Sequence, residues 1–386
     1  MAIILNSKKG DSGNLSYELC MVELLTEFLD KEKINYMFWV KDKTIISDVE
    51  KIIGIKKKNK IKIYKKQKLR FFYIVLNHYE KIRMFINQRG MNYIEKIFQT
   101  NTFYFLSPND LALVISTPNI ISTFWDFGHK ELKGYKETSS LAKRIKREYY
   151  YQQICRRSQI VVVESEQTKN KMYKYYSIRK EIIKVIGLPL PKKIEIKKDL
   201  KQTNEIGGRY FIYPAANWNH KNHVFIIEVF KEFVKINPEV KMVFCGPRIR
   251  GQVNLNKLIR KNKMQNSIID FRYIPKENVN YLISESIALL MPTKLGPTNY
   301  PVFEANFLRT RSIISNVHEL SSIKNIMETT TVINDWKIEN WLSEMENAYS
   351  SKGLIKDINI RKSYNEDMIK GLVRTLRTEF WENNKH

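Results

Sequence analysis

The amino-acid sequence predicts an α/β protein built from two doubly wound domains, each with a parallel sheet. Short apolar runs typical of buried strands alternate along the chain with longer segments whose apolar residues follow helical spacing. The length of 386 residues exceeds what one small core needs and suits two domains of ordinary size. A lysine-rich stretch, 191–208, holds little that could pack, so we expect it to be the linker between two similar halves.

The first half, residues 1–190, is expected to alternate strands with helices. The helix that follows the first strand shows the clearest pattern, with Leu19, Val22, Leu25 and Leu29 recurring at helical spacing. The expected elements are strand Ala2–Leu5, helix Leu15–Lys31, strands Tyr36–Val40 and Ile61–Tyr64, helix Leu69–Ile86, and strands Phe103–Leu106, Leu113–Ser116, Ile120–Trp125 and Ile160–Val163.

The second half, residues 209–367, repeats this alternation. In open parallel sheets ligands bind beyond the carboxyl ends of the strands, so the loops that follow the strands are the places to look for a site. The expected elements are strand Tyr210–Tyr213, helix Val224–Ile236, strand Val240–Cys245, helix Leu255–Lys263, strand Ile268–Tyr273, helix Val279–Ser284, strand Ala288–Met291, helix Phe303–Arg309 and strand Ser312–Ser315.

The net charge of +26 is distributed unevenly. Between Lys51 and Arg70 there are ten Lys or Arg and no Asp or Glu. Such a stretch attracts a polyanion, either a nucleic acid or the anionic leaflet of a membrane. The alternative is a solvated lysine face in a sequence of biased composition.

Composition restricts the class of protein further. A hydrophobic content of 43% with 12% aromatics excludes a wholly disordered chain. The three cysteines are far apart and show no paired spacing, so neither a disulfide framework nor a zinc site is expected, which suits a reducing cytoplasm. Because no apolar run approaches the roughly 20 residues needed to span a bilayer, we expect a soluble or peripheral protein.

The loop after the expected strand Ala288–Met291 is the strongest candidate for a ligand site. It is rich in Gly, Pro, Thr and Asn and leads into a helix, where Pro301 suits an early position. Free backbone N–H groups at a helix start bind anions, whereas Glu304 could accept hydrogen bonds from the hydroxyls of a ribose. The combination fits a nucleotide-sugar. The alternative is an ordinary strand–loop–helix connection with Glu304 as a surface acid.

Two other strand ends carry groups capable of chemistry. Lys221 precedes the first helix of the second half, and a lysine beside a helix start suits a diphosphate, although it could be an ordinary surface lysine. Asp126 and His129 follow the strand Ile120–Trp125 and could meet a substrate hydroxyl and a developing charge, or form a structural pair. His220 and His223 are three residues apart, but no third ligand of suitable spacing appears, so no metal is expected.

These motifs resemble those of retaining glycosyltransferases of family 4, a GT-B group that includes bacterial polysaccharide and lipopolysaccharide enzymes. Gly296 to Ala305 match the donor-binding variant G-P-T-N-x-P-x-x-E-A. Many members carry two glutamates eight positions apart; Glu304 matches the second, and Gly296 stands in the place of the first. The resemblance implies the GT-B fold, in which two Rossmann-like domains have parallel sheets that face each other across a cleft. It implies an N-terminal acceptor domain, a C-terminal nucleotide-sugar domain and, in residues 368–386, a helix over Met368–Trp381 that returns to the first domain.

The resemblance also assigns roles to individual residues. Lys221 lies in an H-K-N segment whose lysine contacts the donor diphosphate, and Asn222 follows it. The arginine that commonly precedes this lysine is missing from Ala215–Asn217, so Arg248 or Arg250 could supply the second charge. Asp126 and His129 lie in a W-D-x-x-H-[RK] segment and would organise the sugar and the acceptor. Three further sets of positions would bind the donor. At Gly13 the first loop would approach the donor, and the backbone of Tyr273 and Ile274 would receive the nucleobase. The positions around the diphosphate would be Gly296, Pro297, Thr298, Asn299 and Tyr300.

The expected function is therefore transfer of a sugar from a nucleoside diphosphate-sugar to a hydroxyl of a glycan or lipid-linked glycan, with retention and without a metal ion or other cofactor. The protein would lie in the cytoplasm, on the inner face of the membrane. The lysines that would contact the anionic membrane and present the acceptor are Lys56, Lys57, Lys58, Lys60, Lys62, Lys65 and Lys66.

Two other classes of protein remain as alternatives. A nucleic-acid-binding protein would explain the charge, but the basic run lacks interleaved aromatic residues, and no zinc-finger, RNP or helix-turn-helix signature is present. A nucleotide-sugar epimerase of GT-B shape would share the donor half but would not need a basic membrane face. The sequence contains neither a G-x-S-x-G elbow nor a phosphate-binding G-x-x-x-x-G-K-[ST] loop, which argues against a serine hydrolase and an ATPase.

Overall fold

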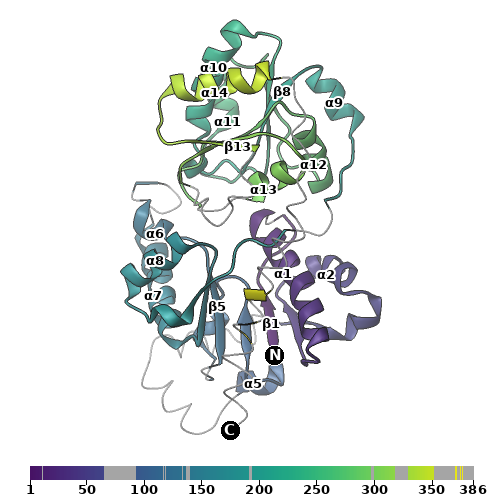
Figure 1. Ribbon diagram of the computed structural model, residues 1–386, viewed down its shortest axis with the longest axis vertical. Coiled ribbons are helices and arrows are strands. Elements are labelled where there is room, and N and C mark those ends of the chain that lie inside the picture. Colours follow the sequence, from purple (N-terminus) through teal and green to yellow (C-terminus); the bar gives the residue numbers. More distant parts are fainter. Residues whose placement is uncertain are drawn as a thin grey trace. The chain divides into compact units, whose positions relative to one another are not determined.

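The chain forms two compact units. Unit 1 comprises Met1–Trp125, Ile145–Pro189 and Tyr364–His386, and unit 2 comprises Asp126–Arg144 and Leu190–Ser363. Each unit contains one parallel sheet with helices on both faces, shown in Figure 1. The computed structural model describes residues 1–10, 12–64, 93–115, 117, 119–132, 134–135, 140–190, 194–296, 300–317, 329–351, 370–371, 374 and 376.

In the described part of unit 1 the sheet has seven strands in the order β3-β2-β1-β4-β5-β6-β7, and neighbouring strands are parallel. Its central strands are continuous apolar runs because helices cover both faces of the sheet. The strands are β1 (Ala2–Leu5), β2 (Met37–Val40), β3 (Ile61–Ile63), β4 (Phe103–Phe105), β5 (Ile120–Phe124), β6 (Ile160–Val163) and β7 (Ile183–Val185).

The helices of unit 1 occupy the connections between these strands. Helices α1 and α2 pack on each other, whereas α7 and α8 lie on the other side of the sheet (Figure 1). Ser165 caps α8 by accepting a hydrogen bond from the backbone N–H of Thr168. The α-helices in this part of the chain are α1 (Ser12–Lys31), α2 (Ile46–Ile53), α5 (Tyr93–Phe98), α7 (Leu141–Arg157) and α8 (Glu166–Tyr176), and the 3₁₀ helices are η1 (Lys43–Ile45), η2 (Ile55–Lys60), η3 (Asp110–Leu113) and η4 (Lys180–Ile182).

Most strands expected in the first half are confirmed, but the strand expected at Leu113–Ser116 is wrong. Asn109 caps a 3₁₀ helix there by accepting a hydrogen bond from the backbone N–H of Leu111 at 2.9 Å. The Arg157 guanidinium then donates to the carbonyls of residues 112, 113 and 115, which turns them away from a sheet ladder. The sequence analysis also missed β7, and the helix expected at Leu69–Ile86 lies outside the described residues.

In the described part of unit 2 the sheet has six strands in the order β10-β9-β8-β11-β12-β13, again parallel throughout. The sequence analysis found the first five of these and missed β13 and the helix that follows it. The strands are β8 (Tyr210–Pro214), β9 (Lys241–Cys245), β10 (Ile268–Asp270), β11 (Leu289–Met291), β12 (Ser312–Ser315) and β13 (Thr330–Ile333).

Helices cover both faces of this second sheet. The α10–α14 pair and the α12–α13 pair lie on opposite sides of it (Figure 1). Trp341 of α14 is fully buried against the same core as Phe230 and Phe233 of α10. The helices of unit 2 are α6 (Gly128–Glu131), α9 (Leu200–Ile206), η5 (Asn219–Lys221), α10 (His223–Ile236), α11 (Leu255–Lys261), α12 (Lys276–Ser284), α13 (Tyr300–Phe307) and α14 (Ile338–Ser350).

The stretch 191–208, expected as a linker, is instead packed on unit 2 over its described part, 194–208. Asp199 caps helix α9, and Ile206 at the end of that helix is buried in the core. Asn278 and Asn280 of α12 donate side-chain hydrogen bonds to the carbonyls of Lys197 and Glu195, both at 2.9 Å. The lysines therefore face solvent while the backbone is held by the unit.

Two boundaries of the units differ from those expected or concern candidate site residues. Residues 126–144 group with unit 2, although they fall within the first half expected from the sequence. The segment Tyr364–His386 groups with unit 1, but the helix expected at Met368–Trp381 lies almost wholly outside the described residues. Of that segment the structure describes Lys370, Gly371, Arg374 and Leu376, and Leu376 is buried.

Candidate functional site

The candidate site of unit 2 lies where the order of its strands reverses. Strand β8 leads through α10 to β9 on one side, whereas β11 leads through α13 to β12 on the other. Ligands of doubly wound sheets bind at this switch point, beyond the carboxyl ends of the strands. The loops after β8 and β11 contain Lys221 and Gly296, two residues expected to bind the donor.

These two loops are held together by hydrogen bonds. The backbone N–H of Lys294 donates to the carbonyl of His220 at 2.7 Å. Behind them, Ser315 at the end of β12 donates through Oγ to the carbonyl of Thr293 at 2.5 Å, and the Tyr213 hydroxyl donates to the carbonyl of Lys221 at 2.5 Å. The two loops are therefore a single fixed structure at the carboxyl edge of the sheet.

Lys221 is partly buried at the end of η5. Asn222 follows in the left-handed region with φ 56°, and α10 begins at the next residue. Burial lowers the pKa of Lys221 to about 8, and the nearby Asp126 carboxylate opposes part of that shift. An anionic ligand beside this ammonium would favour the protonated form, so the site is prepared for a negative charge.

The Asp126–His129 segment lies beside the same loops. Asp126 accepts a hydrogen bond from the backbone N–H of Gly128 at 2.6 Å, which shapes the turn into α6. A Cβ atom at Gly128 would lie 2.9 Å from Cδ2 of Leu295, so this turn packs directly on the loop after β11. His129 is buried, and its carbonyl accepts a hydrogen bond from Arg144 at 3.1 Å. The structure thus brings Asp126 close to Lys221.

Gly296 has a backbone conformation that favours glycine. Its φ of 102° lies in a region that residues with a side chain rarely adopt. This conformation gives a physical reason for glycine where the resemblance places a glutamate. Pro297, Thr298 and Asn299 lie outside the described residues, and Tyr300, the first residue of α13, is buried.

Glu304 is a buried acid, so the alternative that it is a surface carboxylate is wrong. Its side chain in α13 is 4% exposed, and Oε2 accepts a hydrogen bond from the ammonium of Lys276 at the start of α12. The sequence analysis missed Lys276. The two residues are 28 positions apart on different helices, and no local pattern indicates that α12 and α13 pack together.

The loops after β9 and β10 also approach each other closely. Gly246 donates its backbone N–H to the carbonyl of Arg272 at 2.6 Å, and a Cβ atom on it would lie 2.6 Å from the backbone of Ala215. Beyond this crossing Tyr273 is 56% exposed, whereas Ile274 packs partly on the core. Tyr273 and Ile274 therefore lie at the carboxyl edge, after β10, as expected.

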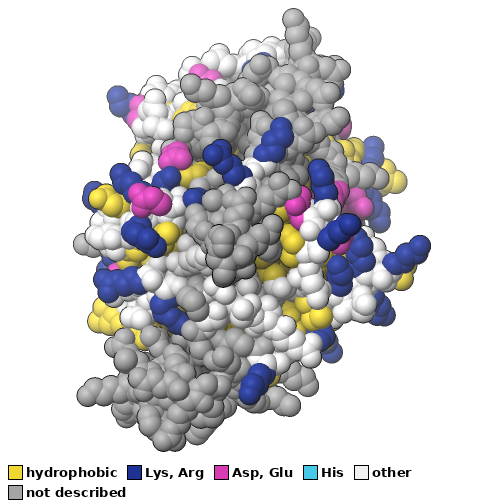
Figure 2. Space-filling model, turned by 60° about the horizontal axis from the view of Figure 1, so that its bottom comes forward, with side chains coloured by type: hydrophobic (Ala, Val, Ile, Leu, Met, Phe, Trp, Pro, Cys, Tyr) yellow, Lys and Arg dark blue, Asp and Glu magenta, His cyan; other side chains and the backbone are white. Residues whose placement is uncertain are grey.

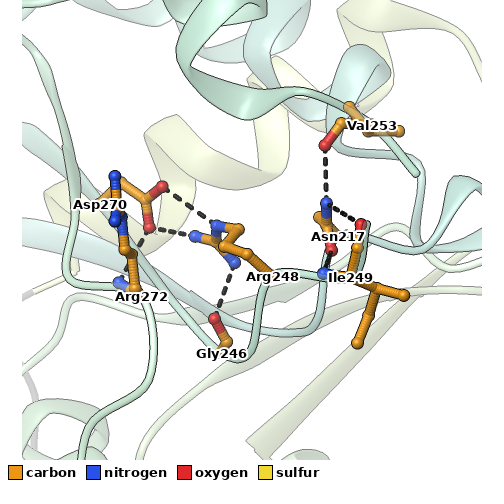
Figure 3. Close-up of polar contacts among 7 residues, drawn as sticks. All are labelled: Asn217, Gly246, Arg248, Ile249, Val253, Asp270 and Arg272. Carbon is orange, nitrogen blue, oxygen red and sulfur yellow. Dashed lines mark hydrogen bonds and ion pairs between the residues drawn. The ribbon is translucent and has the colours of Figure 1, made fainter. Parts of the chain in front are cut away.

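Arg248, one of the two arginines considered as a second cation for a diphosphate, is held by protein partners. Its guanidinium forms a bidentate pair with Asp270 and also donates to the carbonyl of Gly246 at 2.8 Å (Figure 3). The other residue considered for that role, Arg250, is exposed. Figure 3 also shows Asn217, which accepts from the N–H of Ile249 at 2.6 Å and donates to the carbonyl of Val253 at 2.7 Å.

These contacts border a hollow of about 320 Å³. Asn217 ties its loop to the segment 249–253, and the Arg248–Asp270 pair closes another side. Arg250 and Arg272 add positive charge, so the hollow carries more cationic than anionic groups.

His223 is a core residue and not a metal ligand. Its ring lies 4.8 Å from that of Tyr213 and 5.3 Å from that of Phe244, and the side chain is fully buried. Burial lowers its pKa to about 3, helped by the nearby charges of Arg248 and Lys221. Among the residues that the structure describes, no group of three or more His, Cys, Asp or Glu could hold a metal ion.

Gly13 lies in unit 1, in the first turn of α1. A Cβ atom placed on it would meet no atom within 4 Å, so the backbone there is open to an approaching group.

The basic stretch of unit 1 is partly neutralised by acids. Lys57 and Lys60 form ion pairs with Asp30, and the ammonium of Lys60 also lies 3.7 Å from the ring of Tyr36. Lys58 is exposed, with Glu50 at 3.9 Å, whereas Lys62 lies over Trp39. Lys65 and Lys66 lie outside the described residues.

Exposed apolar residues accompany the lysines that remain at the surface. Ile55, next to the exposed Lys56, is 86% exposed, and Ile63 at the end of β3 is 46% exposed. On the face shown in Figure 2, described Lys and Arg side chains are spread widely and are not gathered into one patch. In the described ranges, no helix is both long and apolar enough to cross a membrane.

Comparison with known proteins bears on the fold and on unit 2. Residues 195–361 match the family described as Glycosyl transferases group 1. A search of curated protein sequences gives no match.

Solved structures that resemble the chain over nearly its whole length share little of its sequence. One is Anabaena Alr3699/HepE in complex with UDP and glucose, with 11% identity, a TM-score of 0.64 and 99% of each chain covered. Another is sucrose-phosphate synthase from Thermosynechococcus elongatus, with 12% identity, a TM-score of 0.63, and 99% of this chain and 96% of that chain covered. A third is a glycosyltransferase from Rickettsia africae ESF-5, with 14% identity, a TM-score of 0.60 and the same coverage.

At such low identity these likenesses establish the fold, whereas the family match covers residues 195–361, most of unit 2. Two parallel sheets of doubly wound type, in the arrangement shared with these structures, are the GT-B fold. Residues 195–361 therefore match the group 1 glycosyl transferases, within a chain that has the GT-B fold.

Proposed function

We propose that this glycosyltransferase moves a sugar from a nucleoside diphosphate-sugar to a hydroxyl of a glycan or lipid-linked glycan, with retention at the anomeric carbon. One observation carries most of the weight: Lys221, Asp126 and the loop that ends at Gly296 meet at the switch point of the second sheet. Support for the donor class comes from the group 1 family match and from UDP in the Anabaena protein of the same fold.

The leaving group determines what the site must stabilise. As the glycosidic bond to the diphosphate breaks, negative charge grows on the diphosphate oxygens, so fixed donors there lower the barrier. Lys221 supplies an ammonium, and the backbone around Gly296 leads to the N-terminus of α13, where N–H groups favour an anion. On this proposal these groups offset the charge of the diphosphate without a metal ion.

The Asp126 carboxylate and the His129 imidazole would act on the sugar side of the glycosidic bond that breaks. Asp126 and His129 lie on the turn that packs against Leu295, so they adjoin the loop that holds the diphosphate. We assign them to orienting the sugar and the acceptor hydroxyl. Retention is inherited from the resemblance to family 4.

The acceptor is proposed to be presented at a membrane by unit 1. Lys56 and Lys58 are exposed, and Ile55 beside them projects into solvent, a combination of charge and apolar surface that suits an anionic lipid interface. Lys57 and Lys60 contribute less, because Asp30 already pairs with both. The protein would then act in the cytoplasm on the inner face of the membrane, in polysaccharide or lipopolysaccharide synthesis.

A thermal-shift screen tests the donor class directly. A nucleotide-sugar present at a hundredfold excess over its Kd should stabilise the protein by about 2.7 kcal/mol, and no metal should be needed. Nucleotide-sugars with different bases and sugars would be compared with single-stranded RNA and DNA. Stabilisation by nucleic acid but by no nucleotide-sugar would favour the nucleic-acid-binding alternative and refute the proposal.

An epimerase is separated from a transferase by its products. Incubation of the stabilising nucleotide-sugar with enzyme alone should leave the sugar unchanged. Conversion into an epimer under these conditions would favour the epimerase of the same fold.

A further inference from the structure

The buried carboxylate of Glu304 has a cationic partner that neither the motifs nor the family match assigns. Lys276 is the first residue of α12, and its ammonium donates to Oε2 of Glu304 in α13. The side chain of Glu304 is 4% exposed and that of Lys276 is 49% exposed. One member of the pair is thus fixed in the protein, and the other can reach a bound molecule.

The position of Lys276 places this pair at the carboxyl edge of the sheet. Burial raises the pKa of the Cys245 thiol at the end of β9, and the charges of Lys276 and Arg248 oppose that rise. Lys276 therefore lies near the ends of β9 and β10, on the side of the sheet where Tyr273 and Ile274 are expected to receive the base. The pair thus joins the start of α12, directly after that loop, to α13, whose N-terminus is proposed to bind the diphosphate.

The hydrogen bonds of Glu304 leave room for a ligand. Lys276 occupies Oε2, whereas within the described residues Oε1 accepts no hydrogen bond. A hydroxyl has one hydrogen to donate and lone pairs that accept, so a vicinal diol can donate to an acceptor and also accept from a donor. A carboxylate beside an ammonium provides both, whereas a carboxylate alone provides only the acceptor.

We propose that Lys276 and Glu304 together recognise the ribose of the donor nucleotide. Glu304 accepts a hydrogen bond from one ribose hydroxyl, and the Lys276 ammonium donates to a ribose hydroxyl oxygen. The inference rests on the proposed function and adds to it a residue that determines specificity, because the pair selects ribonucleotides over 2′-deoxyribonucleotides. A site built to bind a hydroxyl discriminates against the analogue that lacks it, since its polar groups are then left unpaired.

Calorimetric titration measures this preference. The probe is the nucleoside diphosphate, chosen from UDP, GDP, ADP and CDP, that stabilises the wild-type protein most, together with its 2′-deoxy counterpart. A hydrogen bond to a charged group corresponds to a preference of about tenfold to a hundredfold for the ribonucleotide. Lys276→Met should lose most of this preference, and Lys276→Arg should keep it because the guanidinium also donates.

Two further variants exclude a merely structural effect. Lys231 is an exposed lysine of α10, so Lys231→Met is a matched control that should leave both affinities unchanged. Lys276→Met alone leaves the buried carboxylate of Glu304 without its cation and could fail to fold. The double variant Lys276→Met/Glu304→Gln removes both charges and avoids that cost. It should show the same loss of preference.

The possible failures are distinguishable. If the wild-type protein binds no nucleoside diphosphate, the proposed function itself is wrong. If it binds one but Lys276→Met discriminates between ribose and 2′-deoxyribose as the wild type does, only the role of Lys276 is refuted. If the double variant also discriminates as the wild type does, the role of Glu304 at the ribose is refuted too. A wild-type preference for the 2′-deoxyribonucleotide would also overturn the inference.

Discussion

Replacement of Lys221 by methionine should make the free protein more stable while it abolishes donor binding. Burial lowers the pKa of Lys221 from 10.5 to about 8, even with Asp126 nearby. In the unfolded chain the ammonium regains its ordinary pKa. Between pH 8 and 10.5 the unfolded state therefore binds more protons than the folded state, and stability rises with pH. Below pH 8 both states are protonated, so the full cost of burying the charge is present.

The magnitude follows from these two values. The interval between 10.5 and about 8 corresponds to about 3 kcal/mol, because each pKa unit is worth about 1.4 kcal/mol. Methionine has a similar length and no charge, so the free energy of unfolding should increase by about 3 kcal/mol at pH 7. At pH 10 the wild-type lysine is neutral in the folded state and about one quarter neutral in the unfolded state, so the gain should fall below about 1 kcal/mol.

Urea unfolding at pH 7, 8.5 and 10 would measure this gain, with and without the nucleotide-sugar that stabilises the wild type. Lys231→Met, on the exposed face of α10, controls for the loss of a lysine charge in general and should show no pH-dependent gain. A Lys221→Met variant that is less stable than the wild type at pH 7, or whose advantage persists at pH 10, would refute the idea of a desolvated lysine. Donor-induced stabilisation equal to that of the wild type would refute its role in binding.

Three other outcomes are expected. Gly246→Ala should lower the free energy of unfolding by about 2–4 kcal/mol in thermal unfolding, because the new Cβ would meet the backbone of Ala215. Gly251→Ala, where φ is positive but the space is open, should cost only backbone strain of about 1–2 kcal/mol. Equal losses in the two variants would contradict the clash. Liposome co-sedimentation should show binding to anionic vesicles, and this binding should weaken as the salt concentration rises. It should fall more for Lys56→Glu/Lys58→Glu than for Lys57→Glu/Lys60→Glu, because Asp30 already pairs with Lys57 and Lys60. Equal binding to neutral vesicles would indicate that these lysines only form a solvated surface. Transferase activity should survive EDTA, and a loss that added Mg²⁺ or Mn²⁺ restores would show that a metal ion is required.

Local patterns in the sequence predicted the two sheets well. Strands such as Ala2–Leu5 and Ile160–Val163 are continuous apolar runs because both faces of a parallel sheet are covered, and that requirement can be read from a few adjacent residues. The strand expected at Leu113–Ser116 failed for a reason outside its own sequence, since Arg157 donates to its carbonyls from a distant helix. Tertiary contacts of this kind leave no local pattern.

The same distinction applies to the candidate site. Lys221 and Gly296 follow β8 and β11, neighbouring strands of one sheet, so their meeting at its carboxyl edge follows from topology. Asp126 follows β5 of the other sheet, so the topology of the second sheet does not predict its place near Lys221. Pairings between side chains of different helices were not predictable in this way. The sequence did not indicate that Asp270 would occupy Arg248 or that Lys276 would reach Glu304, because each pair is joined only by the packing of the loops that carry it.

The grouping of residues 126–144 with unit 2 changes how the protein can be divided. The chain passes from one unit to the other four times, at 125/126, 144/145, 189/190 and 363/364. A fragment cut at the obvious place, 190–363, would retain Lys221 and Glu304 but would lack Asp126, His129 and the turn that packs on Leu295. Such a fragment could report on nucleotide binding, whereas, with the roles proposed for Asp126 and His129, sugar transfer should require that the earlier segment remain on the same polypeptide or be supplied in trans.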